Sequence, residues 1–329
     1  MLKKDKTKLF RVGVATGPTD PESPTNPTGP TAEEMVMNCA ISKLKADRTP
    51  IPDNRFTLPP EYGVNGGGSS DAFNGHEYVD LGLPSGTLWA KMNVGAESET
   101  DAGLYFAWGE TQGYTASQVG TDKNFSPDDY ALTEDGGSTF TKYNAIDGKT
   151  HLELTDDAAA ANMGGDWHMP NRAQCIELFK ETKNGFVTNA GAFTQYAWDD
   201  SNGYSSPTQT PVTIDNWNTA GYFFFKSDVS DMNAAVTSGD YLFIPAAGGC
   251  EDGRVLNVGT FGVVWASALS SESVEYAWRF GFYSGGAGVY NYDRFCGQSV
   301  RGVVGQMDEI TDETTPGGGG GVAPSEPLS

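Results

Sequence analysis

The chain has 329 residues, of which 42 are Gly, 18 are Pro and 12% are aromatic, while 19% are charged. This turn-rich and aromatic-rich composition favours a β protein and excludes a helical bundle or a coiled coil. Acidic residues outnumber basic ones 43 to 21, and the net charge of −22 should repel nucleic acid and anionic membranes, so neither is an expected partner.

Residues 1–75 have the composition of an extended arm that ends in a linker, with a Pro/Thr run at residues 16–31 and a Gly/Ser stretch at residues 63–71. The first eleven residues hold five basic residues and one acidic residue. Composition also allows a disordered tail, whereas the basic tip followed by apolar residues predicts a peptide that docks on another protein. The predicted attachment residues are Lys3, Lys4, Lys6, Lys8, Phe10 and Arg11.

Residues 76–306 contain short β-type runs separated by turn residues, which predict a domain with several strands. Alternation in the run YAWRFGFY places Trp278, Phe280 and Phe282 on one face, where we expect the core, and Arg279 on the other. The strongest strand predictions are residues 77–83, 87–94, 221–228, 241–248, 262–269, 276–284 and 299–305.

Two helices are predicted between these strands. The first has Asp156 and Asp157 in its opening turn and stops at Gly164. The second begins at Asn171, and Gln174 three residues later completes a capping-box pattern. Strands around two short helices predict an α+β domain. Residues 307–329, which are acidic and Gly-rich, are predicted to be a flexible tail.

The sequence offers little for catalysis, because its three histidines stand in unrelated contexts and no hydrolase or phosphate-binding motif occurs. We therefore expect neither an enzyme nor a cofactor. The best calcium candidate is the group Asp199, Asp200 and Asn202, but it lacks calcium-loop spacing and a solvated turn explains it better, so no metal is expected. The four cysteines are too scattered for a disulfide framework and are predicted to be free thiols.

The segment 265–302 holds four tyrosines and six serines, with Asn291, Asp293 and Arg294 close to two of the tyrosines, and residues of these types make large contacts at low entropic cost in binding surfaces. Aromatic faces beside polar side chains also suit sugar rings. We expect Tyr283 and a turn at residues 290–294 to be exposed. The predicted ligand-binding residues are Tyr283, Tyr290, Asn291, Tyr292, Asp293 and Arg294.

Successive sequence blocks between residues 75 and 304 resemble a domain family of gut Bacteroidales and their phages. The blocks are HEYVDLGLPSGTLWAKMNVGA, AGLYFAWGET, LTDDAAAANMGGDWHMPNRAQCIELF, LFIPAAGG, NVGTFGVVWASAL and GQSVRGVV. This family is similar to the C-type lectin fold, in the branch shared with formylglycine-generating enzyme, which implies two short helices packed on twisted antiparallel sheets.

The resemblance implies binding rather than catalysis. The enzyme of that branch uses paired cysteines near its C-terminal end, whereas Cys296 stands alone here. The same branch includes phage receptor-binding proteins diversified by retroelements, and their variable stretch corresponds to residues 267–296.

These features together predict a phage fibre or decoration protein on the virion surface. Its arm would bind other virion proteins, and its lectin-like domain would bind a glycan or protein of the host cell, with a homotrimer as the expected assembly. The start of the chain lacks the apolar run of a signal peptide, which a virion protein assembled in the host cytoplasm does not need. The alternatives are a bacterial surface or secreted adhesin of the same domain family and a purely architectural virion component.

Overall fold

The computed structural model describes residues 72–305. All of the described residues belong to one compact unit. Within residues 72–305, no helix is both long and apolar enough to cross a membrane. The predicted tail lies outside the described residues, as do the predicted attachment residues Lys3, Lys4, Lys6, Lys8, Phe10 and Arg11.

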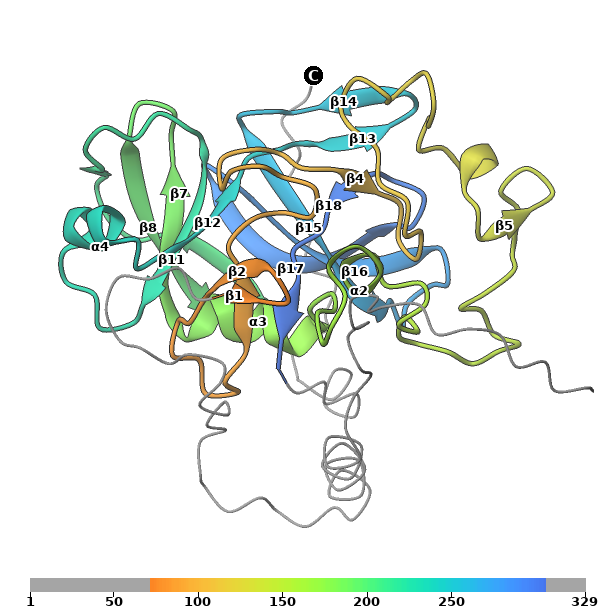
Figure 1. Ribbon diagram of the computed structural model, residues 1–329, viewed down its shortest axis with the longest axis horizontal. Coiled ribbons are helices and arrows are strands. Elements are labelled where there is room, and N and C mark those ends of the chain that lie inside the picture. The colour runs from red at the N-terminus through yellow and green to blue at the C-terminus, as the bar shows by residue number, and fades with distance from the viewer. Residues whose placement is uncertain (1–71, 306–329) are drawn as a thin grey trace, which may run out of the picture. The chain divides into compact units, whose positions relative to one another are not determined.

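The described part of the chain is mostly β, with three short α-helices and one 3-10 helix (Figure 1). The helices are η2 (Pro127–Asp129), α2 (Ala158–Met163), α3 (Arg172–Lys180) and α4 (Met232–Ser238). The strands are β1 (Ala72–Phe73), β2 (His76–Val79), β3 (Leu88–Ala90), β4 (Tyr105–Phe106), β5 (Thr133–Glu134), β6 (Thr139–Phe140), β7 (Thr182–Val187), β8 (Ala192–Asp199), β9 (Tyr204–Pro207), β10 (Val212–Thr213), β11 (Gly221–Lys226), β12 (Leu242–Pro245), β13 (Gly249–Glu251), β14 (Arg254–Leu256), β15 (Phe261–Leu269), β16 (Tyr276–Tyr283), β17 (Gly286–Asp293), β18 (Gln298–Ser299) and β19 (Val303–Val304).

One large sheet dominates the architecture. Its strands follow the order β12-β11-β7-β8-β9-β17-β16-β15-β18-β4, and β10 pairs with β8 at the side. Most neighbours are antiparallel, while β15 and β18 are parallel. A four-stranded sheet has the order β1-β2-β3-β19, and β5–β6 and β13–β14 form separate hairpins. This β-rich arrangement with few helices is consistent with the predicted α+β class.

Both predicted helices are present, and their caps explain where they begin. Asp157 is the N-cap of α2 and accepts a hydrogen bond from the Ala160 N–H at 2.9 Å, so it precedes the first turn rather than lying within it. Asn171 and Gln174 form the predicted capping box of α3. Such caps satisfy N–H groups that have no partner inside the helix. The sequence analysis missed α4.

Removing the α3 cap tests this account. Replacing Asn171 by Ala should lower the free energy of unfolding by about 1 kcal/mol, because the Gln174 N–H loses its acceptor. Replacing Asn171 by Ser keeps an acceptor and should cost only a few tenths of that amount. Urea unfolding followed by circular dichroism measures both, and equal losses for the two variants would contradict the capping role.

The core lies on both faces of the large sheet. Helix α3 contacts β7, β8, β15, β16 and β17, and its Phe179 packs with Tyr222 and Phe224 of β11. The alternate residues Phe223 and Phe225 belong to a second apolar cluster, which includes residues of α4. Five successive residues of β11 are therefore buried.

The same two-sided burial adds to the prediction for β16. Phe280 and Phe282 are fully buried, as predicted, and the half-buried Trp278 packs against the same cluster. The opposite face is not a surface, however, because Ala277 and Arg279 are only 0% and 2% exposed. Alternation alone distinguished the two faces correctly but could not show that both are covered.

Candidate functional site

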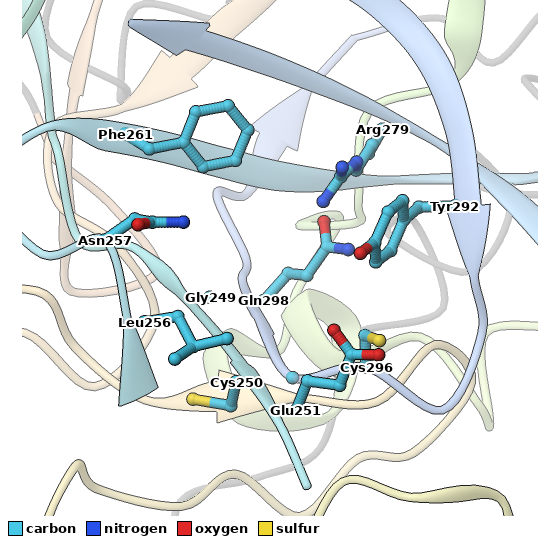
Figure 2. Close-up of a pocket in the computed structure, with 11 residues that line it drawn as sticks. Gly249, Cys250, Glu251, Leu256, Asn257, Phe261, Arg279, Tyr292, Cys296 and Gln298 are labelled. Carbon is cyan, nitrogen blue, oxygen red and sulfur yellow. The ribbon is translucent and has the colours of Figure 1, made fainter. Parts of the chain in front are cut away.

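A small pocket lies where the β13–β14 hairpin approaches β15, β16 and β17 (Figure 2). Its volume is about 20 Å³, which is room for one water-sized group. The pocket is partly open to solvent, and both aromatic and polar side chains line it. The side chains that give it chemical character are Glu251, Asn257, Phe261, Arg279, Tyr292 and Gln298.

Backbone pairing brings these residues together from distant parts of the chain. Arg279 on β16 lies opposite Trp265 of β15 and Tyr290 of β17. The backbone N–H and C=O of Cys250 bond with those of Gly297 at 2.7 and 2.8 Å, which ties β13 to the segment before β18. Because β18 runs parallel to β15, Gln298 comes to lie beside the β15–β17 strands.

Arg279 is held in the pocket wall by aromatic rings. Its guanidinium carbon lies 3.7 Å from the ring centre of Tyr292 and 4.7 Å from that of Tyr290, both within cation–π range. Gly281 allows this packing, because a Cβ at that position would lie 2.1 Å from the Tyr290 hydroxyl. The stacking therefore fixes the direction in which the guanidinium points.

Two carboxamides in the pocket have no hydrogen-bond partner within residues 72–305. Gln298 is 1% exposed, and neither its Nε2 nor its Oε1 has a partner there. Asn257 is half-buried, and no described residue bonds its side chain. Figure 2 shows the Gln298 carboxamide between Arg279 and Tyr292, with the Asn257 carboxamide pointing toward the same space. Buried polar groups without a partner are costly, so this pair marks a place where an external group can bind.

The predicted binding residues are only partly where the sequence analysis put them. Residues 290–293 of the segment expected to be a turn form the end of strand β17, and Tyr283 is the last residue of β16. Tyr283, Asn291, Tyr292 and Asp293 are half-buried, and of these only Tyr292 lines the pocket. Burial raises the pKa of Asp293, and the nearby Glu275 raises it further.

Two of the predicted residues are not exposed, which corrects that expectation. Tyr290 is 7% exposed and packs beneath Arg279, while Arg294 is 0% exposed. The Arg294 side chain donates four hydrogen bonds to groups in three other segments. An arginine held in this way is part of the core and does not reach a ligand.

Sequence reasoning missed Glu251, Asn257 and Gln298 as site residues. Gln298 lies inside the block GQSVRGVV, but no local pattern shows that its side chain faces a pocket. For Asn257 the residue type is the one usable signal, because asparagine tolerates a positive φ better than most residues. In the structure its φ is 60°, and its C=O accepts a hydrogen bond from the Phe261 N–H at 3.0 Å. That turn aims the side chain into the pocket.

A second, wider groove of about 570 Å³ lies between residues 109–114 and 123–131. Three of its four charged side chains, Glu110, Lys123 and Asp129, already pair with one another. The Lys123 ammonium is 2.9 Å from Glu110 Oε2 and also bonds the Asp129 carbonyl oxygen. Since Lys123 is 5% exposed, this network fixes the two loops together and leaves the Arg279–Gln298 pocket as the stronger candidate.

The other candidates of the sequence analysis form local structure. The Asp199 carboxylate accepts hydrogen bonds from Ser201 and Asn202, and Asp200 pairs with Lys180 at 2.8 Å. No group of three or more His, Cys, Asp or Glu residues within the described range could hold a metal ion. The three cysteines in that range are buried thiols, as predicted, and Cys39 lies outside it.

Comparisons with protein-family models, with curated proteins and with solved structures gave no match for this chain.

Proposed function

We propose that the chain is a phage virion protein, a fibre or decoration protein, whose domain of residues 76–306 has a C-type-lectin-like fold and binds a glycan or protein on the host cell. The observation that carries the binding role is the pair of unbonded carboxamides, Asn257 and Gln298, which face one pocket. The order of the sequence blocks supports the virion family, and α3 packed on a largely antiparallel sheet is compatible with the proposed fold.

The revised binding face is centred on the pocket. It keeps Tyr292 from the predicted set and adds Glu251, Asn257 and Gln298. Tyr283, Asn291 and Asp293 are half-buried on β16 and β17 and do not line it. In this proposal the basic arm attaches the protein to other virion proteins, and several copies, as in a trimer, give avidity that makes weak single sites sufficient. Catalysis has no part in it.

Adsorption to cells tests the proposal. The full-length protein, presented on beads in many copies, is mixed with intact gut Bacteroidales cells, and the bound beads are counted. Wild-type protein should adsorb saturably. The Asn257→Asp variant should adsorb about tenfold less, because it loses two donors and adds a charge at the pocket while keeping a residue type that tolerates the local backbone.

Asn216→Asp is the matched control. Asn216 also has a φ of 60°, is exposed, and lies outside the pocket, so adsorption should remain at the wild-type level. Equal adsorption of the two variants would overturn the assignment of the site. Absence of adsorption by folded wild-type beads would overturn the attachment role and favour an architectural virion component.

A further inference from the structure

The Gln298 carboxamide specifies what chemical group can complete the pocket. It presents N–H donors and a carbonyl acceptor, and both ends lack a partner among the described residues. A carboxylate offers only acceptors and an ammonium offers only donors, so either would leave one end of Gln298 unbonded. A hydroxyl both donates and accepts, and it can satisfy both ends.

The size of the pocket limits the group to a single hydroxyl. A volume of about 20 Å³ has space for one water-sized group and none for a ring or a carboxamide. The rest of the ligand must therefore lie outside the pocket mouth. The half-buried Asn257 carboxamide, which also lines the pocket, supplies further donors and an acceptor.

The charges around the pocket favour an uncharged ligand. One guanidinium, that of Arg279, and one carboxylate, that of Glu251, line it. The surrounding domain carries 29 acidic and 12 basic residues, so an anionic ligand meets a repulsive field. A cationic ligand would meet Arg279, which aromatic rings hold in the wall.

From these three features we infer that the pocket takes one hydroxyl of a neutral sugar residue, with the sugar ring lying at the pocket mouth beside Asn257. This inference rests on the proposed function and names the ligand class of the same site. A hydroxyl from a serine or threonine of a surface protein is the competing source. The experiment below separates the two.

The direct test is titration of the full-length protein with single sugars, followed by NMR of its side-chain amide groups. The probes are glucose, galactose, mannose and N-acetylglucosamine, with glucuronic acid and glucosamine as charged counterparts. The Gln298 amide signals, identified by their loss in Gln298→Leu, should shift saturably with at least one neutral sugar. The charged counterpart should bind at least about tenfold more weakly.

Two variants distinguish a loss of sugar binding from a loss of folding. Gln298→Leu removes both polar ends at similar volume and should abolish the saturable shifts of other pocket residues. Ser299→Ala removes the neighbouring buried hydroxyl, which also lacks a partner within residues 72–305 but does not line the pocket, and it should bind as wild type does. If no neutral sugar moves the Gln298 signals, or if Gln298→Leu binds as wild type does, the inference is wrong.

Treated cells distinguish failure of the inference from failure of the proposed function. Periodate cleaves vicinal diols of glycans, and protease removes surface proteins. Loss of bead adsorption after periodate alone supports a sugar ligand. Loss after protease alone would overturn the sugar inference and keep the attachment role. Saturable sugar binding without any adsorption to cells would keep the ligand class and overturn the attachment role.

Discussion

Replacing Arg294 by Ala is expected to lower the free energy of unfolding by about 4 kcal/mol, a large fraction of the stability of a typical domain. Its side chain is 0% exposed and donates to the Tyr130 hydroxyl and to the carbonyl oxygens of Lys142, Tyr143 and Val274, at 2.9 to 3.1 Å. The substitution leaves four acceptors without this donor, two of them in buried contacts and two in part-buried ones, and opens a cavity between aromatic rings.

Arg294→Lys and Arg254→Ala complete the series. Lysine keeps the charge, but its single ammonium cannot reach the four acceptors that the planar guanidinium reaches. Arg294→Lys should therefore recover less than half of the free energy of unfolding that Arg294→Ala loses. Arg254 is exposed on β14, and its replacement should change stability by less than about 0.5 kcal/mol. Urea unfolding at a fixed pH measures the three variants, and a loss below about 1 kcal/mol for Arg294→Ala would contradict a structural role for this guanidinium.

Local patterns in the sequence were sufficient for the elements whose causes are local. The start of α3 was predictable because Asn171 and Gln174 bond each other's backbone over three residues. The strands β11, β15 and β16 were predictable because long apolar and aromatic runs leave few alternatives. The less regular strands β7 and β8, and the short helix α4, carry no such run and were missed.

The site was harder to predict because its geometry depends on non-local pairing. Gln298 faces the pocket only because β18 joins β15 in parallel, a register that nothing near residue 298 encodes. Arg294 was misjudged, and the role of Arg279 was not predicted, for a shared reason. Each is surrounded by aromatic residues from other segments, and a sequence that shows arginine beside tyrosine does not tell whether the rings cover the guanidinium or flank it at the surface.

The protein is expected to unfold cooperatively as the pH rises from about 10 to about 11.5, because ionised tyrosines are incompatible with its core. Burial raises the pKa of six tyrosines that are at most 6% exposed, and for Tyr143 the value reaches about 12. The six are Tyr105, Tyr130, Tyr143, Tyr196, Tyr222 and Tyr241. A tyrosine whose pKa is raised in the folded state contributes its full stabilisation at any pH below 10.0, the pKa in the unfolded chain. This stabilisation is lost as the pH rises above that value.

The size of the effect follows from the number of groups. One pH unit above the unfolded pKa, each tyrosine that the fold keeps neutral costs about 1.4 kcal/mol, so six cost about 8 kcal/mol, which is within the range of total domain stability. Burial also lowers the pKa of Arg301 to about 9, which works in the opposite direction for one group only. Phenolate absorbance and near-ultraviolet circular dichroism, recorded together during an alkaline titration, should therefore change in one coincident step. Gradual phenolate formation with unchanged circular dichroism would mean that these hydroxyls reach water in the folded protein, and the packing of the aromatic core described above would be wrong.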